Sequence, residues 1–511
     1  MNGTIYKTHK DTLVISSNTR IILYFCKIRT NNLNYSILMS GVRKKKVEDL
    51  LIGLVDADLL DNGTRHPNLA LLKIAGFLKD NNIPHELILD GDADISKYDR
   101  IFISKVFTFT KMPAFYEKAN EFIWHAKIAV GGTGFYADEV NAKMFTGKRV
   151  EDMSRLEKDG FLNLFPNQRG GERERGIDMA RQMPEYDLYA PFIEKQIQRG
   201  SKREKYKDYE KYSIGFLTRG CIRHCAFCIN KLEKRVQRYS DLEWFLDESK
   251  DDRGHLKRPY IYLWDDNFLA SDKTIWKPLL QKLIDSGRPF QFRQGLDERM
   301  LAQSPDGEEM AEMLSKAKYH GDFIFAFDNW RDREVIEKAL KIWKRFNPKK
   351  GTKFYLFCGF KQTPEDREKF YKDIWELFQR IRILMRYGCV GYVMRHQDYH
   401  KAPIANIYIQ IARWCNQQQF YKKMSFWEFC YRNQSYWEEH CLQDSSRPKL
   451  MTFEEFELDV KNGYYKNVKM CLPLRDIVDI LGMFPEHRSK LIEMFNFKMS
   501  SLLDPTLWKK P

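Results

Sequence analysis

The sequence predicts an α/β protein with an N-terminal doubly wound parallel sheet, a central partial (β/α)6 TIM-type barrel and a C-terminal, mainly helical region. Short, continuous apolar runs recur between stretches with helical periodicity, which is typical of buried parallel strands joined by helices. The last hundred residues are instead rich in aromatic residues and helix formers. These patterns divide the chain into an N-terminal extension (1–45), a Rossmann-type domain (46–150), a linker (151–210), a barrel (211–400) and a helical domain (401–511).

Size and composition set limits on the class of protein. A chain of 511 residues is too long for one ordinary core, and its content of 43% hydrophobic and 14% aromatic residues supports globular packing. No apolar run is long enough to span a membrane, and the N-terminus lacks the pattern of a secretory leader, so a cytoplasmic protein is expected. Ten cysteines in so long a chain are not a small secreted disulfide framework. The net charge of +15 is compatible with a nucleic-acid partner, but the basic residues are spread along the chain and also serve solubility.

The first 45 residues do not share the strand–helix pattern of the residues after them. Apolar and polar residues alternate around Ile21–Phe25, and a basic run lies at Arg43–Lys46. Met39 is a plausible alternative start, so these residues are either an extension or an edge hairpin.

The region from Leu50 to Gly134 shows a β-α-β pattern. The residues after the first strand, from Asp56 to Gly63, are expected to form a loop, and a helix is expected from Pro67 to Asn81. Such alternation predicts a parallel sheet that binds ligands at the carboxyl ends of its strands. The run Gly131–Gly134 lacks dinucleotide-binding spacing and favours a tight turn or a close backbone approach. The strands are expected at Leu50–Val55, Glu86–Leu89, Ile101–Ile103 and Ile128–Val130.

The linker and the barrel come next in the chain. Charged residues from Arg199 to Lys211 are typical of a solvated linker, in which Tyr186 and Tyr189 either pack or cover the mouth of the barrel. Six strands alternating with helices predict a partial barrel, whose chemistry lies at the carboxyl ends of the strands. The strands are expected at Ser213–Leu217, Tyr260–Trp264, Phe290–Arg293, Phe323–Phe327, Phe354–Phe357 and Val390–Met394.

Polar residues gather where these strands end. Their oxygens could bind ribose hydroxyls or an ammonium group, and an arginine could meet a carboxylate. The alternative is that they only cap the next helix. No catalytic residue is assigned. The candidate residues for cofactor binding at the strand ends are Asp265, Asp266, Asn267, Arg293, Gln294 and Asp328.

Aromatic residues dominate the C-terminal region from Trp414 to Tyr436, and helical core is favoured over base stacking. Cys415, Cys430, Cys441 and Cys471 raise the idea of a second cluster, but their spacing matches no compact ligand motif.

The most specific feature of the sequence is a cysteine triad. Cys221, Cys225 and Cys228 are spaced C-x3-C-x2-C, and a [4Fe–4S] cluster held by three thiolates has one iron open to a ligand. A closed zinc site needs four ligands, and His224 is poorly placed to be the fourth because it adjoins Cys225.

With an aromatic residue, Phe227, before the last cysteine and a strand before the first, residues 211–400 resemble the radical S-adenosylmethionine (SAM) superfamily. The resemblance implies that the three cysteines hold a [4Fe–4S] cluster and that SAM chelates the fourth iron. It also implies reductive cleavage of SAM, packing of Phe227 near the adenine, and an electron donor such as flavodoxin or ferredoxin. Asp265–Asn267 take the place of the family's SAM-amino segment, which is often Gly-Gly-Glu.

Residues 50–150 resemble the cobalamin-binding domain found before many radical SAM barrels. They contain no D-x-H-x-x-G motif, and His66 and His85 lie in other surroundings, so loss of the cofactor is favoured over binding without a histidine.

The expected function is therefore a radical SAM enzyme, an oxidoreductase or transferase whose substrate the sequence does not name. The alternatives are a cobalamin-dependent radical methyltransferase and a tRNA- or nucleic-acid-modifying enzyme. A non-enzymatic alternative is a nucleic-acid-binding protein with a structural metal site.

Overall fold

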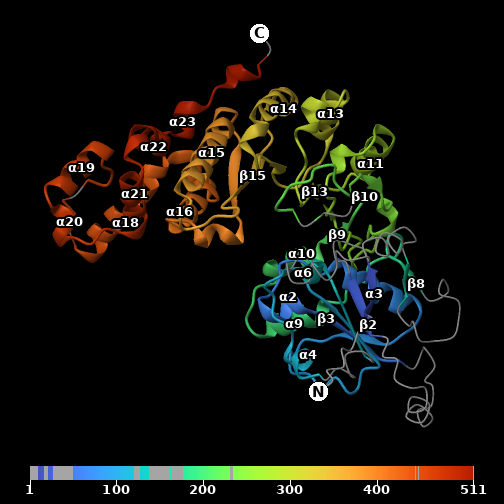
Figure 1. The fold of residues 1–511 in the computed structure, drawn as a ribbon. Helices are drawn as coiled ribbons and strands as arrows, with labels where there is room; N and C mark the ends of the chain where they lie inside the picture. Colours follow the sequence, from blue (N-terminus) through green and yellow to red (C-terminus); the bar gives the residue numbers. More distant parts are fainter. Residues whose placement is uncertain are drawn as a thin grey trace, which may run out of the picture. The chain divides into compact units, whose positions relative to one another are not determined.

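The computed structural model describes residues 10–15, 21–26, 50–119, 127–136, 161–163, 176–228, 230, 234–443, 445–446 and 448–509 (Figure 1). The chain forms two compact units, and each is described by itself. Unit 1 comprises residues 1–224, 228–265 and 286–290, and unit 2 comprises residues 225–227, 266–285 and 291–511. These limits differ from the ranges expected from the sequence, because the first two expected barrel strands belong to unit 1.

Unit 1 contains a four-stranded parallel sheet in the order β4-β3-β5-β6. The strands are β3 (Ile52–Asp56), β4 (His85–Leu87), β5 (Arg100–Ser104) and β6 (Ile128–Gly131). The strand order reverses between β3 and β5, which is where a doubly wound sheet offers a crevice. All four predicted strands are confirmed; β3, β5 and β6 are buried throughout, as expected of strands covered on both faces, whereas β4 is partly exposed.

The segment after β3 corrects one expectation. Residues 57–61 form a short helix, α2 (Ala57–Asp61), where a loop was expected. The Asp56 carboxylate caps this helix by accepting the Leu59 N–H at 3.1 Å. Helix α3 (Leu69–Asp80) begins after the N-cap Asn68, as the sequence predicted to within two residues.

The glycine run after β6 allows the close backbone approach that was expected. A Cβ atom on Gly132 would lie 2.2 Å from the Lys105 carbonyl oxygen, and one on Gly134 would lie 2.6 Å from that of Phe107. Glycine is therefore required at both positions. The short helix α6 (Thr133–Tyr136) comes after this run, and α4 (Ala114–Lys118) lies between β5 and β6 in the chain.

Two antiparallel hairpins accompany this sheet in the chain. β1 (Lys10–Ile15) pairs with β2 (Ile21–Cys26), so the hairpin alternative holds for these residues of the extension. β7 (Phe161–Asn163) pairs with β8 (Gly176–Asp178).

Residues 176–210 form regular structure, although the charged side chains from residue 199 to 211 are mostly exposed, as expected of a solvated segment. They form α9 (Ala190–Gln198), the 3-10 helix η3 (Arg203–Tyr206) and α10 (Lys207–Glu210). Most of their charged residues are exposed, but four tyrosines from this stretch are buried against the core of the N-terminal sheet: Tyr186, Tyr189, Tyr206 and Tyr209.

All six strands predicted after residue 210 are present. They are β9 (Tyr212–Gly215), β12 (Tyr260–Leu263), β13 (Phe290–Phe292), β14 (Phe323–Ala326), β15 (Thr352–Cys358) and β16 (Val390–Arg395). β9 pairs with β12 in parallel, β13 adjoins β12, and β14-β15-β16 form a parallel sheet of their own. A parallel bridge from Leu296 to Phe325 lies between β13 and β14.

Helices come after most of these strands. They are α11 (Lys273–Asp285), α12 (Met300–Gln303), α13 (Gly307–Lys316), α14 (Arg333–Phe346) and α15 (Arg367–Arg386). Between β9 and β12, however, the described residues contain no α-helix, only the 3-10 helix η4 (Leu242–Trp244). The first of the expected β/α units therefore lacks a described α-helix.

The sheet β14-β15-β16 has two different faces, because side chains alternate along a strand. Phe323 and Phe325 pack edge-on against Trp343 of α14, so this face is covered by helices. Tyr392 and Met394, two residues apart on β16, are exposed. On this second face these two side chains are therefore open to solvent.

The C-terminal region of unit 2 is helical, as predicted, and its aromatic residues form core. Trp414, Phe426 and Trp427 are buried, whereas Tyr436 is exposed. Ser425 begins the longest of these helices, α18, with a capping box formed with Glu428. The helices are α16 (Asn406–Cys415), α17 (Gln418–Lys423), α18 (Phe426–Cys441), α19 (Phe453–Lys461), α20 (Tyr464–Asn467), α21 (Leu472–Met483), α22 (Arg488–Asn496) and α23 (Met499–Leu502).

Across the described part of the chain, none of the helices combines the length and the apolar character that crossing a membrane requires.

Candidate functional site

The cysteine triad lies in a loop that is closed at its base. β10 (Thr218–Arg219) pairs antiparallel with β11 (Gln237–Arg238), and the three cysteines lie between these two short strands. All three side chains are half-buried and none forms a disulfide. The pairing of β10 with β11 therefore holds the two ends of the loop next to each other.

Asp265 holds the start of this loop. Its carboxylate is buried and accepts the Thr218 N–H at 2.6 Å, the Thr218 hydroxyl at 2.7 Å and the Leu217 N–H at 3.2 Å. Hydrogen bonds from donors to a charged carboxylate are stronger than neutral ones. The structure therefore gives Asp265 a role in positioning the loop, which the sequence did not indicate.

Cys221 accepts a hydrogen bond within the loop. The Arg223 N–H lies 3.3 Å from its Sγ. Backbone hydrogen bonds to cysteine sulfur are one of the means by which proteins tune the potential of iron–sulfur clusters.

The cysteines are divided between the two compact units. Cys221 and Cys228 belong to unit 1, and Cys225 to Phe227 belong to unit 2. Within the described residues, no three His, Cys, Asp or Glu side chains are grouped closely enough to hold one metal ion. The case for a cluster therefore rests on the spacing and chemistry of the cysteines.

Phe227 belongs to an aromatic cluster in unit 2. Its ring stacks on Phe357, at the carboxyl end of β15, with centroids 3.7 Å apart and an interplanar angle of 24°. Phe360 and His396 complete the cluster, with centroids 4.9 Å apart. The residue predicted to lie near an adenine is thus set among flat rings at a strand end.

Asp328 reaches the same strand end. Its Oδ1 accepts the Phe357 N–H at 3.2 Å, so Asp328 and the aromatic cluster share a backbone contact. Burial raises the pKa of Asp328 to about 6, and the Arg380 guanidinium opposes this rise. A carboxyl group poised in this range is typical of functional sites, although structural networks also produce it.

Arg380 is a residue that the sequence did not single out. It is buried on α15, and its guanidinium donates to the carbonyl oxygens of Phe327 (2.7 Å), Asp328 (3.1 Å) and Phe357 (3.0 Å). Three carbonyls from two neighbouring strand ends thus converge on one cation. No sequence pattern marks this role, because only the folded chain brings α15 against both strand ends.

The remaining predicted strand-end residues have separate settings. Asn267 is buried and its Nδ2 donates to Asp297 Oδ2 at 3.2 Å, whereas Asp266 is half-buried. Arg293 is half-buried and donates to Gln291 Oε1 at 3.0 Å, and Gln294 is exposed.

The sequence also did not indicate a group of ion-paired side chains next to Asn267. Arg299 binds Asp297 at 2.6 Å and Asp332 at 2.8 Å. Glu298, which lies between Asp297 and Arg299 in the sequence, is buried. Burial raises the pKa of its carboxyl group well above the ordinary value, and the Asp297 charge acts in the same direction. Its Oε2 accepts the backbone N–H of Ala326 in β14 at 3.2 Å, which is a structural role.

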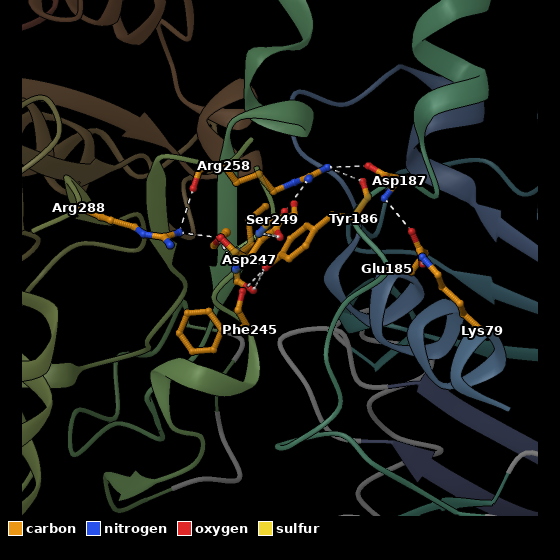
Figure 2. A network of polar contacts seen from close by, with 11 residues as sticks. Lys79, Glu185, Tyr186, Asp187, Phe245, Asp247, Ser249, Arg258 and Arg288 are labelled. Carbon is orange, nitrogen blue, oxygen red and sulfur yellow. Dashed lines mark hydrogen bonds and ion pairs between the residues drawn. The ribbon is translucent and has the colours of Figure 1, made fainter. Parts of the chain in front are cut away.

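Tyr186 anchors unit 1 around β9 (Figure 2). Its hydroxyl accepts the Ile214 N–H at 2.8 Å and donates to the Phe245 carbonyl at 2.6 Å. The Arg258 guanidinium contacts the same residue. It donates to the Tyr186 carbonyl at 3.0 Å and forms an ion pair with Asp247 at 2.8 Å. Of the two roles considered for this tyrosine, packing is the one that the structure shows.

The two described histidines of the N-terminal domain, His66 and His85, are engaged elsewhere. His66 Nδ1 lies 3.1 Å from Asp208, and its ring meets Trp264 edge-on. His85 begins β4, at the amino edge of the sheet, and its Nδ1 lies 2.9 Å from the Ile83 carbonyl. Together with the missing D-x-H-x-x-G motif, these settings do not fit a histidine ligand to cobalamin.

The C-terminal cysteines do not resemble cluster ligands. Cys415 and Cys430 are buried, and burial raises the pKa of both thiols. Burial also raises the pKa of Cys471 to about 11, and Cys441 is exposed on α18. Buried neutral thiols are typical of core cysteines.

Comparison with known proteins adds no relative: no protein-family model matches the chain, and no curated protein matches its sequence.

Proposed function

We propose that this protein is a radical SAM enzyme in which Cys221, Cys225 and Cys228 hold a [4Fe–4S] cluster. The observation that carries the proposal is the C-x3-C-x2-C spacing in a loop that comes after a parallel strand and is closed at its base by the β10–β11 ladder. When bound, such a cluster with one open iron supplies the single electron that splits SAM into methionine and a 5′-deoxyadenosyl radical.

The strands follow their chain order within each of two sheets, β9-β12-β13 and β14-β15-β16, and this order supports the proposal of a partial (β/α)6 barrel. In such a barrel the loop after β9 and the carboxyl ends of β14 and β15 belong to the functional edge. The residues present suit the expected cofactors, because none of the three thiols is tied up in a disulfide and Cys221 already accepts an N–H.

Each residue then has a defined task. Asp265 orients the start of the loop through Leu217 and Thr218. Phe227 and Phe357 offer a flat apolar surface for an adenine, and the Asp328 carboxyl is an acceptor next to it for a hydroxyl or ammonium group.

The test is anaerobic reconstitution followed by reduction in the presence of SAM. We expect about four irons per chain and the release of 5′-deoxyadenosine. Cys225→Ala should abolish both, whereas Cys441→Ala, which removes an exposed cysteine from α18, should change neither.

Zinc in place of iron, or a reduced cluster that releases no 5′-deoxyadenosine even with candidate substrates present, would contradict the proposal. The first result would favour a structural metal site.

A further inference from the structure

The loop after β5 displays two aromatic rings to solvent. Phe107 and Phe109 are 49% and 73% exposed, and their rings stack with centroids 5.3 Å apart and an interplanar angle of 15°. Single exposed aromatic residues are common, but a stacked pair this exposed gives up much apolar burial.

The backbone beneath these rings is firmly held. The buried Asp58 carboxylate accepts the Val106 N–H at 2.6 Å and the Phe107 N–H at 3.2 Å, and also binds the Thr110 hydroxyl. On the other side, Gly134 N–H donates to the Lys105 carbonyl at 3.0 Å. The pair is therefore presented on a fixed loop at the carboxyl edge of the sheet, beside the point where the strand order reverses.

A cationic cleft of about 630 Å³ lies in the same compact unit. Five cationic side chains line it against three acidic ones. Arg203 and Arg258 are paired with carboxylates, but Lys207, Lys211 and Lys257 are exposed, and the described residues include no carboxylate in an ion pair with them. These three lysines are open to solvent and to anions, although the Lys211 charge also acts on Asp251.

Two aromatic contacts shape this cleft. Lys207 Nζ lies 5.0 Å from the centre of the Tyr260 ring, which holds the ammonium group over an apolar surface. Tyr209, which also lines the cleft, donates to the Thr64 carbonyl at 3.0 Å. Thr64 lies in the loop after α2, so a residue that lines the cleft contacts a loop that comes after a strand of the same sheet.

We propose that unit 1 binds single-stranded nucleic acid, with Phe107 and Phe109 stacking on bases and Lys207, Lys211 and Lys257 contacting phosphates. Stacking platforms combined with a cationic groove are the means by which proteins bind single strands without reading their sequence. The net charge of +15 adds long-range attraction for such a polyanion. The proposal is independent of SAM cleavage, because binding needs neither cluster nor cofactor.

Fluorescence anisotropy with labelled oligonucleotides of about 12 nucleotides tests it, using the full chain without SAM. Single-stranded RNA, single-stranded DNA and a duplex of the same sequence are compared, and AMP serves as a competitor. We expect both single strands to bind more tightly than the duplex. Displacement by AMP at micromolar concentration would instead assign the cleft to a free nucleotide and overturn the proposal.

Two sets of variants separate the contributions. Phe107→Ala/Phe109→Ala should weaken binding by about tenfold or more with an unchanged salt dependence. Lys207→Ala/Lys211→Ala/Lys257→Ala should weaken binding and lower the slope of log Kd against log salt by about 2, because each phosphate contact contributes about 0.7.

Matched control variants remove exposed lysines and an exposed aromatic ring outside the proposed binding surface. Lys338→Ala/Lys341→Ala/Lys349→Ala deletes three exposed lysines of unit 2, and Tyr436→Ala deletes an exposed aromatic ring. An equal loss in the control variants would show unspecific attraction and overturn the proposal, as would equal affinity for the duplex. Phe-dependent binding to anionic lipid vesicles without binding to oligonucleotides would overturn it in favour of a membrane surface.

Discussion

At the scale of single residues, buried polar side chains tie distant segments of this chain together. Tyr186, Asp265 and Arg380 each bind backbone groups of other elements, at separations of 23 to 59 residues. Such contacts leave no local pattern, because only the folded chain brings their partners within reach. The cysteine triad, by contrast, is marked by its spacing in the sequence, and its role as a cluster site stays a prediction.

Removal of the Tyr186 hydroxyl tests this anchoring. Tyr186→Phe should lower the free energy of unfolding by about 2 kcal/mol, because the Ile214 N–H and the Phe245 carbonyl lose their buried partner. Urea denaturation measures the change. Tyr436→Phe, at an exposed position, is the control, and an equal effect in both variants would show that the buried hydroxyl adds nothing.

Asp56 makes stability depend on pH. Burial raises its pKa from 3.8 to about 7, against the opposing hydrogen bond from Tyr189. Between these two values the folded state keeps a proton that the unfolded state loses. Stability from this group is therefore present below about pH 4 and is lost as the pH rises to about 7, by up to about 1.4 kcal/mol per pH unit.

The matching variant is Asp56→Asn, which cannot titrate. Denaturation between pH 4 and 8 should show a flatter dependence than the wild type, whereas Asp252→Asn, at an exposed site, should follow the wild type. A variant curve parallel to that of the wild type would rule out Asp56 as the source.

At the scale of elements, continuous apolar runs made the buried strands predictable, and all ten expected strands outside the extension are present. The expectations for local structure and burial were wrong where the contacts of single side chains counted for more than the composition of the segment. Asp56 caps α2, where a loop was expected, and Tyr206 and Tyr209 are buried within the otherwise charged stretch of residues 199–211.

The end of β9 is packed too tightly for any side chain. A Cβ atom on Gly215 would lie 2.3 Å from the Phe245 ring. Gly215→Ala should therefore destabilise the protein by about 1–3 kcal/mol, and Phe245→Leu in the same chain should restore part of this loss. Thermal unfolding is the measurement.

Gly482→Ala provides the comparison for this substitution. No atom lies within 4 Å of its added Cβ, and it lies within α21, so alanine should stabilise the protein by up to about 1 kcal/mol. Equal effects of the two substitutions would exclude the ring contact as the cause.

At the scale of the whole molecule, the sequence predicted mixed α/β architecture with parallel sheets, and this is confirmed. The limits of the two compact units could not be predicted in the same way. They depend on which strands pair across the chain, such as β9 with β12, which are neighbours in the sheet although a long segment separates them in sequence.

The chain passes between its two compact units five times, after residues 224, 227, 265, 285 and 290. Two of these passages lie inside the cysteine loop, on either side of Cys225–Phe227. No single cut of the polypeptide can therefore release either unit whole. The cysteine loop therefore contributes residues to both units, and either unit expressed as one continuous segment would lack part of its own chain.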